Sequence, residues 1–344
     1  MQFIKRDYSA LKSCKELILG ADIGGTNSSF GLFGINKNRL SLISSFHFKS
    51  NEIKNFNDAL KTLLDYTKEE YKIKISKACI AAAGALSPNK DYVKITNSGF
   101  HISRKDVLRC GIKKVILIND FEAVAYGIFM LKKNEIKTVK KAVKAAKAPI
   151  LVIGAGTGMG KSLLLYDSKR ESYVPIASEA GHMDFPAQTK EENDIANFIK
   201  KYRKTNRVAY EDFLSGRGLE NIYYYLRKTK KSKYSKEIDS SSNKPVIISK
   251  HRKTDAVCKE TFEIFTKVYA IFARNFALDC IPFGGVYIAG GIAFRNQDIF
   301  NSKFVKEFEN SKTYKQVLKK IPVYLVKNAN IGLLGAGFDA SGIE

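Results

Sequence analysis

The sequence predicts an α/β protein with two domains. At 344 residues the chain exceeds the ~250–300 residues at which a single hydrophobic core usually stops growing. Strand-like apolar runs alternate with amphipathic helical stretches, a pattern typical of covered sheets in α/β proteins. A strand, a Gly/Thr-rich turn and a second strand occur over 17–33 and again over 149–166, which suggests two related halves.

The first half is predicted to alternate strands and helices. The expected strands cover 17–33, broken by the turn, then 40–48, 77–84 and 113–120. The expected helices cover 55–72, with Asn55 or Asn57 as N-cap, and the stretch that begins at Phe121 directly after the strand 113–120.

The second half is predicted to be more helical. After the hairpin 149–166 and a further strand over 173–177, the sequence indicates helices over 191–204, 218–228 and 255–280, and a final strand over 321–328. The Lys/Ser-rich stretch 229–254 has little periodicity, so we expect a long exposed connection there.

The composition indicates a soluble cytoplasmic protein. The hydrophobic fraction is 44%, and the longest apolar runs fall far short of the ~20 residues that a membrane span needs. Charges scattered through 1–19 argue against a signal peptide. The five cysteines are widely spaced without a CxxC pair, which fits reduced thiols and argues against a zinc site.

The net charge of +24 is unusual and clusters in 131–147 and 227–236. Such clusters can bind nucleic acid or acidic membranes, but they can equally form a solvated lysine coat that attracts an anionic small substrate. No aromatic-rich basic sheet, helix-turn-helix pattern or Cys/His finger accompanies the charge. We therefore do not expect nucleic-acid binding.

The stretch "GAGTGMGKS" (154–162) has the spacing of a loosened Walker A loop. A true P-loop leads into a long helix, whose N-terminus supplies part of the anion site. Here a short apolar run and the turn "DSKRE" follow instead, so the sequence predicts a β-hairpin with a glycine-rich tip. We expect Lys161 to be a solvent-facing strand residue rather than a catalytic lysine.

The stretch "DIGGTN" (22–27) has the same chemistry, with a carboxylate before two glycines and a threonine at a turn between strands. Glycine tips can bring bare N–H groups and a hydroxyl against an anion. Asp22 is suited to bind a water on Mg²⁺. Two such loops suggest a nucleoside triphosphate held between two domains.

From these motifs the chain resembles the actin–hexokinase–Hsp70 ATPase superfamily, and within it the bacterial-type glucokinases. The resemblance spans nearly the whole chain in order: "DIGGTN", "ILINDFEAVAYGI", "IGAGTGMG", "GGVYIAGGI" and "NIGLLGAG" resemble the superfamily's motifs, while "TNSGFHIS", "EAGHMDF" and "YEDFLSGRGLENIY" resemble the glucokinase sugar segments. The zinc-binding cysteine cluster of the related repressor and sugar-kinase (ROK) branch is absent from the sequence.

The resemblance implies a two-domain actin-like ATPase (ribonuclease H-like) fold with an active-site cleft between the domains. It implies a small α/β domain of 1–130 plus 324–344, and a large α/β domain of 131–323 with helical insertions. The implied activity is ATP- and Mg²⁺-dependent phosphorylation of a hexose, with glucose as the expected sugar, by a cytoplasmic enzyme that can form a homodimer.

The resemblance also implies a role for each matching residue. Asp120 would be the base that accepts the proton of the sugar 6-hydroxyl, and Asp22 would orient hydrated Mg²⁺. The implied sugar-binding residues are Asn97, Asn119, Asp120, Glu179, His182 and Glu211. The implied ATP- and phosphate-binding residues are Asp22, Gly24, Gly25, Thr26, Asn27, Gly156, Thr157, Gly158, Gly290 and Gly291.

Structural alternatives stay open for four of these positions. Asp120 precedes a helix and can be its N-cap, and an isolated loop histidine such as His182 is usually structural. Glu211 can be a first-turn charge facing a helix macrodipole. "GGVYIAGG" can be a buried strand with bulges.

Two departures from the family pattern concern the sugar and phosphate sites. Glucokinases of this type usually carry an Arg shortly after GGTN, where this chain has Ser28, Ser29 and Phe30, and Ser178 and Ala180 stand where Gly is commoner. The alternatives left open are a kinase for mannose, fructose or an amino sugar, and a non-catalytic sugar- or nucleotide-responsive regulator on the same fold.

Overall fold

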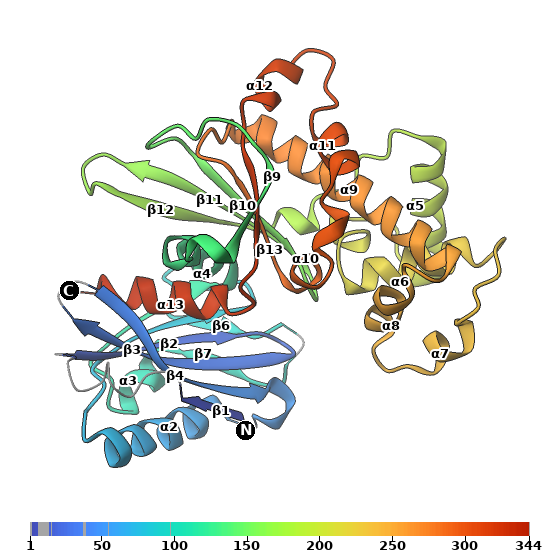
Figure 1. Ribbon diagram of the computed structural model, residues 1–344. Helices are drawn as coiled ribbons and strands as arrows, with labels where there is room; N and C mark the ends of the chain where they lie inside the picture. Colours follow the sequence, from blue (N-terminus) through green and yellow to red (C-terminus); the bar gives the residue numbers. More distant parts are fainter. Residues whose placement is uncertain are drawn as a thin grey trace. The chain divides into compact units, whose positions relative to one another are not determined.

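The computed structural model describes residues 2–5, 14, 16–36, 39–53, 55–96 and 98–343, with the side chains of 2–5 left aside. The chain forms two compact units (Figure 1). The first consists of Met1–Lys132 with Asn330–Glu344, and the second of Lys133–Ala329. Each unit is built around its own mixed sheet.

The sheet of the first unit has the order β1-β4-β3-β2-β5-β8. These strands are β1 (Gln2–Lys5), β2 (Glu16–Ile23), β3 (Asn27–Asn36), β4 (Arg39–Lys49), β5 (Lys77–Ala82) and β8 (Lys114–Asn119). Strands β1 to β4 pair antiparallel, whereas β2, β5 and β8 run parallel. The predicted strands of this half are therefore confirmed, to within a few residues at their ends.

Helices cover both faces of this sheet. On one face, α2 (Phe56–Tyr71) and α3 (Arg104–Arg109) pack their apolar side chains on the strands, and on the other lie α4 (Asp120–Gly127) and α13 (Ile331–Ser341). Asn55 is the N-cap of α2, because its side chain accepts a hydrogen bond from the Asn57 backbone at 2.8 Å. The first unit also holds a small hairpin of β6 (Tyr92–Lys94) and β7 (His101–Ser103) and two short 3₁₀ turns, η1 (Ser50–Glu52) and η2 (Ile128–Met130).

Helices α4 and α13 approach each other closely through small residues. A Cβ on Gly335 of α13 would overlap the carbonyl oxygen of Ala123 of α4. A Cβ on Gly127 at the end of α4 would likewise overlap the Ile331 carbonyl. The returning C-terminal helix is therefore fixed directly against the helix that begins with Asp120.

The sheet of the second unit has the order β12-β11-β10-β13-β14-β9. These strands are β9 (Ile136–Lys140), β10 (Ile150–Ala155), β11 (Met159–Asp167), β12 (Ser172–Ser178), β13 (Val286–Ala289) and β14 (Val323–Val326). Strands β10, β13 and β14 are parallel and the other pairs are antiparallel. Because β14 pairs with β13, the chain stays in the second unit through Ala329 and returns to the first at Asn330.

The core of the second unit lies between its sheet and its helices. Helix α9 (Ala256–Cys280) runs through the middle of this core, where Tyr269 and Phe272 are fully buried. Besides two short helices within 229–254, this unit holds α5 (Lys190–Arg203), α6 (Gly216–Leu226), α10 (Gly291–Arg295), α11 (Ser302–Phe308) and α12 (Lys315–Lys319). The remaining 3₁₀ turns are η3 (Lys133–Glu135), η4 (Ala180–His182), η5 (Tyr210–Asp212) and η6 (Gln297–Ile299). The three helices predicted for this half are confirmed.

The prediction of an exposed connection over 229–254 was wrong. The structure forms α7 (Ser235–Ser240) and α8 (Lys244–His251) there, and Ile238 and Ile248 are fully buried in the core of the second unit. Each short helix buries a single isoleucine completely, so the segment carries too few apolar residues to produce a visible helical period.

Candidate active site

The first glycine loop is the tip of the hairpin between β2 and β3. The Gly24 backbone N–H donates to the Asn27 carbonyl at 3.0 Å, which closes the turn. Buried Ser50, directly after β4, holds this turn with two hydrogen bonds. Its backbone N–H donates to the Thr26 carbonyl at 3.0 Å, and its hydroxyl donates to the Gly24 carbonyl at 2.5 Å. Gly25 and Thr26 remain at least partly exposed, so the loop can present its N–H groups and hydroxyl to an anion.

Asp22 lies near the end of β2, immediately before this loop. Burial raises the pKa of its carboxyl to about 6. Gly332 of α13 packs so closely that an added Cβ would overlap the carboxylate. Within the described residues, Asp22 has no hydrogen-bond or ion-pair partner and no group of three His, Cys, Asp or Glu side chains could hold a metal ion. A single unpartnered carboxylate fits an ion that keeps most of its waters, as Mg²⁺ does.

Lys49 lies beside the first loop. The loop's own sequence has no arginine directly after it, at Ser28 to Phe30. Lys49 at the end of β4 lies opposite Asn27 in the sheet, and its ammonium donates to the Asn27 side-chain oxygen at 3.0 Å. Both side chains are exposed. Ser28 is buried and its hydroxyl lies 2.9 Å from that of Ser50, so this position serves the internal bracing of the loop.

Asp120 is the first residue of α4, and Asn119 is the N-cap. The Asn119 side-chain oxygen accepts from the Phe121 N–H at 2.8 Å, while Glu122 accepts from the Asn119 N–H at 2.9 Å, which completes a capping box. The alternative that Asp120 is itself the N-cap is therefore wrong. Its half-buried carboxylate also accepts from the Phe121 N–H at 2.9 Å.

The capping box at the start of α4 continues to an ion pair in which the carboxylate is buried and the lysine is half exposed. Glu122 is only 4% exposed, and the Lys90 ammonium lies 3.0 Å from its carboxylate. A buried carboxylate needs such a partner, because removing charge from water is costly. Lys90 and Glu122 therefore fix the start of α4, and with it the backbone of Asp120.

Parallel strands bring the first loop and Asp120 to one edge of the first sheet. Strands β2, β5 and β8 lie side by side, with Asp22 opposite Ala81 and Ala82 opposite Asn119. The carboxyl ends of parallel strands are the usual ligand-binding edge of an open α/β sheet. Asn97, the other sugar-site residue predicted in this unit, lies outside the described residues.

The second glycine loop is the tip of the hairpin between β10 and β11. Ala155 pairs with Met159, and the Gly156 N–H donates to the Gly158 carbonyl at 2.8 Å, which leaves Thr157 exposed at the tip. The residues after the loop form strand β11 rather than a helix, so the rejection of a Walker A loop is confirmed.

The expectation that Lys161 faces solvent was wrong. Lys161 is only 8% exposed; its ammonium lies 3.6 Å from Asp279 and 4.6 Å from the centre of the Phe276 ring. The strand alternation places this lysine on the face of β11 that the end of α9 covers, and the ion pair and ring stabilise the buried charge there.

Gly290 and Gly291 form the turn from β13 into α10. Gly290 has φ +90°, and an added Cβ would lie 2.5 Å from the Ala155 carbonyl oxygen, so only glycine fits. The alternative that this stretch is a buried strand holds for Val286–Ala289 alone. Because β10 and β13 are parallel, the two glycines lie at the same sheet edge as the second loop.

Glu179 and His182 lie together on the surface of the second unit. Both side chains are 63% exposed, and the His182 Nε2 lies 3.9 Å from the Glu179 carboxylate. Between them, Gly181 packs on Met159 so closely that a Cβ would overlap its carbonyl oxygen. The glucokinase-like segment 179–185 is thus fixed against the second loop.

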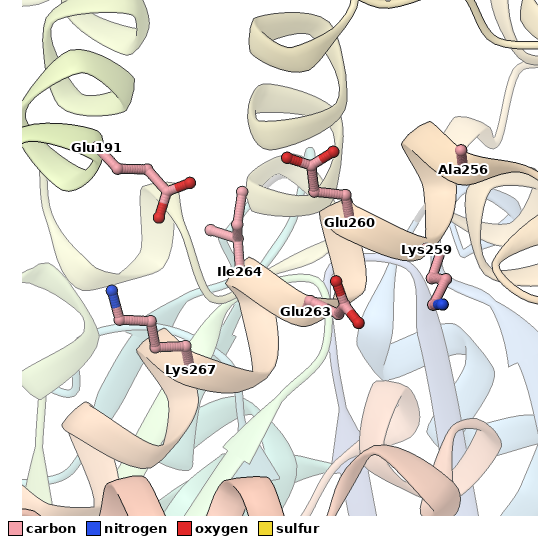
Figure 2. Close-up of a pocket in the computed structure, with 7 residues that line it drawn as sticks. All are labelled: Glu191, Ala256, Lys259, Glu260, Glu263, Ile264 and Lys267. Carbon is pink, nitrogen blue, oxygen red and sulfur yellow. The ribbon is translucent and has the colours of Figure 1, made fainter.

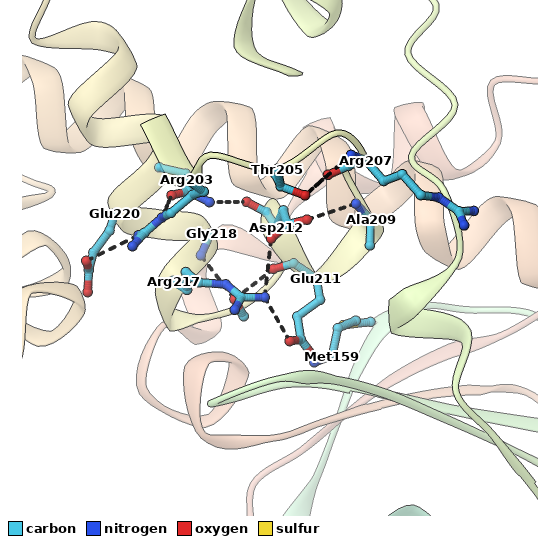
Figure 3. A network of polar contacts seen from close by, with 12 residues as sticks. Met159, Arg203, Thr205, Arg207, Ala209, Glu211, Asp212, Arg217, Gly218 and Glu220 are labelled. Carbon is cyan, nitrogen blue, oxygen red and sulfur yellow. Dashed lines mark hydrogen bonds and ion pairs between the residues drawn. The ribbon is translucent and has the colours of Figure 1, made fainter. Parts of the chain in front are cut away.

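Glu211 lies in the first turn of the short 3₁₀ helix η5, ahead of α6. Its carboxylate accepts from the Met159 N–H at 3.0 Å, and Arg217 donates to it at 3.2 Å. In Figure 3 Glu211 reaches down to Met159 while Arg217 approaches from the side. The second unit therefore brings Gly158, Gly181 and Glu211 together around Met159.

A hollow of about 400 Å³ on the second unit contains none of the predicted site residues. Figure 2 shows it lying along the start of α9. Its lining is mostly charged: Glu191, Ala256, Lys259, Glu260, Glu263, Ile264 and Lys267.

Among the described residues, no helix is long and apolar enough to cross a membrane.

Comparisons with known proteins agree with the motifs. A family profile described as Glucokinase matches residues 19–342. The chain belongs to the glucokinase family. Among curated relatives, a glucokinase of Photorhabdus laumondii is 34% identical over 93% of this chain and 95% of its own, and one of Trichormus variabilis is 30% identical over 94% and 99%. The crystal structure of a glucokinase from an Antarctic psychrotroph is 28% identical and superposes with a TM-score of 0.78, covering 95% of this chain and 99% of that one.

The glucokinase family membership and these structural likenesses confirm the predicted two-domain actin-like fold class. Sequence reasoning missed the residues that support the glycine loops and the start of α4: Ser50, Lys49 and Arg217 for the loops, and Glu122 for the helix. None lies inside a quoted phosphate motif, and each acts across a turn or a neighbouring strand. Arg217 and Glu122 had a local signal, since Arg217 stands within the glucokinase-like segment 210–223 and Glu122 within "ILINDFEAVAYGI".

Proposed function

We propose that this member of the glucokinase family transfers the γ-phosphoryl group of ATP to the 6-hydroxyl of glucose. The family is one of ATP-dependent hexose kinases, and membership over the whole chain favours a catalyst over a non-catalytic regulator. The observation that supports the proposal most directly is the sheet edge of the first unit. There the glycine loop after Asp22 follows β2 and Asp120 follows β8, and both strands run parallel to β5, which lies between them.

In the proposed reaction, the sugar O6 forms a bond to the γ-phosphorus as the bond from that phosphorus to the β–γ bridging oxygen breaks and ADP leaves. Asp120 accepts the proton of the 6-hydroxyl. Phosphoryl transfer depends chiefly on positioning and charge stabilisation, so a carboxylate base is sufficient. The capping box and the Lys90–Glu122 pair support this role, because they fix the start of α4.

We propose that the phosphates bind to the two loops, with Gly24, Gly25, Thr26 and Asn27 in the first unit and Gly156, Thr157 and Gly158 in the second. Gly290 and Gly291 line the adenosine site. Asp22 would hold hydrated Mg²⁺ through a bound water, and the ion would supply positive charge against the phosphates. Lys49 supplies a positive charge beside the first loop, and thereby takes the place of the arginine that the motif usually carries.

The sugar hydroxyls are bound by Asn119, Glu179, His182 and Glu211, together with Asn97. The Asn119 side-chain oxygen caps α4, and within the described residues the amide nitrogen of the same side chain donates no hydrogen bond. This nitrogen is therefore available to donate to a sugar hydroxyl. Amides, carboxylates and imidazole fix a hydroxyl's position and reject analogues that lack it.

The other aspects of the proposal concern the setting of the enzyme. We place it in the cytoplasm, with the small-molecule substrates as its main partners, a homodimer as a possible assembly and no role in nucleic-acid binding. The lysine clusters of 131–147 and 227–236 then form a solvated surface that attracts anionic nucleotide.

The test is a coupled ADP-release assay on the purified protein with Mg-ATP and glucose, mannose, fructose and glucosamine in separate reactions. We expect the highest kcat/KM with glucose, and glucose 6-phosphate as the product by mass spectrometry. A higher kcat/KM with another hexose would overturn the glucose assignment, and absence of turnover with all four would overturn the kinase itself.

A further inference from the structure

The second glycine loop is held by segments that the sequence places elsewhere. The Met159 N–H donates to Glu211 Oε2 at 3.0 Å, and the Gly216 N–H donates to the Gly156 carbonyl at 2.9 Å. Residues 211–216 therefore fasten both sides of the loop tip. Gly158 lies against the same carboxylate, since an added Cβ there would be 2.5 Å from Glu211 Oε2.

The two carboxylate oxygens of Glu211 have different partners. Oε2 accepts from the loop, whereas Oε1 accepts from the Arg217 guanidinium at 3.2 Å. The Glu211 side chain is only 16% exposed, and the Arg217 side chain is 49% exposed. A carboxylate so little exposed is stabilised by a cation and loses a defined orientation without one.

Arg217 also fixes the turn that carries Glu211. The same guanidinium nitrogen lies 3.2 Å from Asp212 Oδ1, and the other oxygen of Asp212 accepts from the Ala209 N–H at 2.9 Å. Figure 3 shows Arg217 facing both acidic residues of η5. Two neighbouring carboxylates repel each other, and the positive charge of one guanidinium offsets that repulsion.

We propose that Arg217 is a positioning residue that holds Glu211 against the second glycine loop, so that a single carboxylate links the sugar contacts to the nucleotide contacts of the second unit. This inference rests on the proposed function, in which Glu211 binds a sugar hydroxyl and Gly156–Gly158 bind phosphate. When Arg217 is removed, the carboxylate turns away from Met159, and the sugar and the nucleotide lose affinity together.

The test compares Arg217→Met, Arg217→Lys and the control Arg207→Met in steady-state assays with glucose and Mg-ATP. Arg207 is a suitable control because it forms an exposed pair with Asp184 in the same unit, with the two side chains 78% and 63% exposed. We expect Arg217→Met to raise the KM for glucose and the KM for ATP, each about tenfold, with kcat changed less than about threefold.

Isothermal titration with Mg-AMPPNP, with and without glucose, gives a second measurement that needs no turnover. We expect glucose to tighten AMPPNP binding in the wild type, and this coupling to fall about tenfold in Arg217→Met. Arg217→Lys keeps the charge and should recover part of both effects, and it also serves if the methionine variant fails to fold.

The inference is overturned if the wild type is active and Arg217→Met changes only one of the two KM values or neither, or if Arg207→Met matches it. Equal coupling in the wild type and in both Arg217 variants would also overturn it. A wild type that phosphorylates no hexose overturns the proposed function, and the inference with it.

Discussion

The two glycine loops have similar tips but are held in different ways. The loop at 24–27 is fastened by hydroxyl and backbone groups of Ser50, which follows β4 of the same sheet. The loop at 156–158 is fastened by the carboxylate of Glu211 and by the Gly216 N–H, from a segment outside its sheet. The first loop thus depends on neutral hydrogen bonds and the second on a charge.

This difference shows that one kind of glycine turn can be fixed by separate physical means in one chain. Neutral bonds make the first loop insensitive to charge changes nearby, and the charged groups Asp22 and Lys49 beside it can face a ligand. The second loop shares its charged support with a predicted sugar residue. Substitutions in the first loop should therefore affect nucleotide alone, and those in the second should affect both substrates.

Asp22→Asn should have the largest effect in the first loop. We expect kcat to fall about 100-fold, because the hydrated Mg²⁺ loses its charged acceptor. This is measured by following the activity of the wild type and of Asp22→Asn as the Mg²⁺ concentration is raised. An unchanged Mg²⁺ dependence would show that Asp22 does not serve the metal.

The same variant should be more stable than the wild type above pH 6. Folding raises the pKa of Asp22 to about 6, so the folded state binds more protons than the unfolded state between about pH 4 and 6. The free energy of unfolding of the wild type therefore falls as the pH rises through this window. Asparagine does not ionise, so Asp22→Asn avoids this fall. Urea unfolding at pH 5 and pH 8 should show a gain of about 1 kcal/mol at pH 8, after a discount for the partial exposure of the group.

Gly158→Ala should harm the second loop more than Gly24→Ala harms the first. The new Cβ at 158 would lie 2.5 Å from Glu211 Oε2, and one hydrogen bond on each oxygen holds that carboxylate in place. The new Cβ at 24 would lie 3.1 Å from the Asn27 carbonyl oxygen. We expect about 1–3 kcal/mol of lost stability for Gly158→Ala and less for Gly24→Ala. Urea unfolding midpoints of the two variants, together with the KM for each substrate, measure these effects. Equal losses of stability in Gly158→Ala and Gly24→Ala would contradict the difference between the two loops.

Ser50→Ala removes one side-chain bond from the first loop and leaves the buried Ser28 hydroxyl without its partner. The expected result is a KM for ATP raised about fivefold to tenfold, since a lost hydrogen bond costs about 0.5–1.5 kcal/mol. The KM for glucose should not change. If both KM values rise equally, the first loop is not specific to nucleotide.

Lys49→Met should have the smallest effect, because exposed charges are worth about 1 kcal/mol or less. We expect about a threefold rise in the KM for ATP that disappears at high salt, while Lys49→Arg behaves like the wild type. The exposed lysine Lys61 on α2 offers a matched control in the same unit. A Lys61→Met variant with the same rise would rule out a specific role.

The sequence predicted those parts of the fold and site that depend on local pattern. Alternating apolar residues and glycine turns indicated both hairpins, and the turn "DSKRE" excluded a Walker A helix after Ser162. Order along the chain also predicted that the site residues follow strands. These signals lie within about ten residues, where periodicity and turn chemistry decide the structure.

The remaining features depend on contacts between distant segments. The burial of Lys161 requires Asp279 and Phe276 on a helix more than a hundred residues away, and nothing in the strand itself reveals that cover. The link from Glu211 to Met159 is likewise invisible in the sequence. In α7 and α8, one buried isoleucine each fixes a short helix without any helical period.

The central claim is that Asp120 is the base for phosphoryl transfer to the sugar. The most direct measurement is glucose 6-phosphate formation by Asp120→Asn, together with glucose binding by calorimetry. We predict that kcat falls by about 10²–10⁴, while the glucose Kd stays within about threefold of the wild type. Asp120→Asn with wild-type turnover would contradict the mechanism.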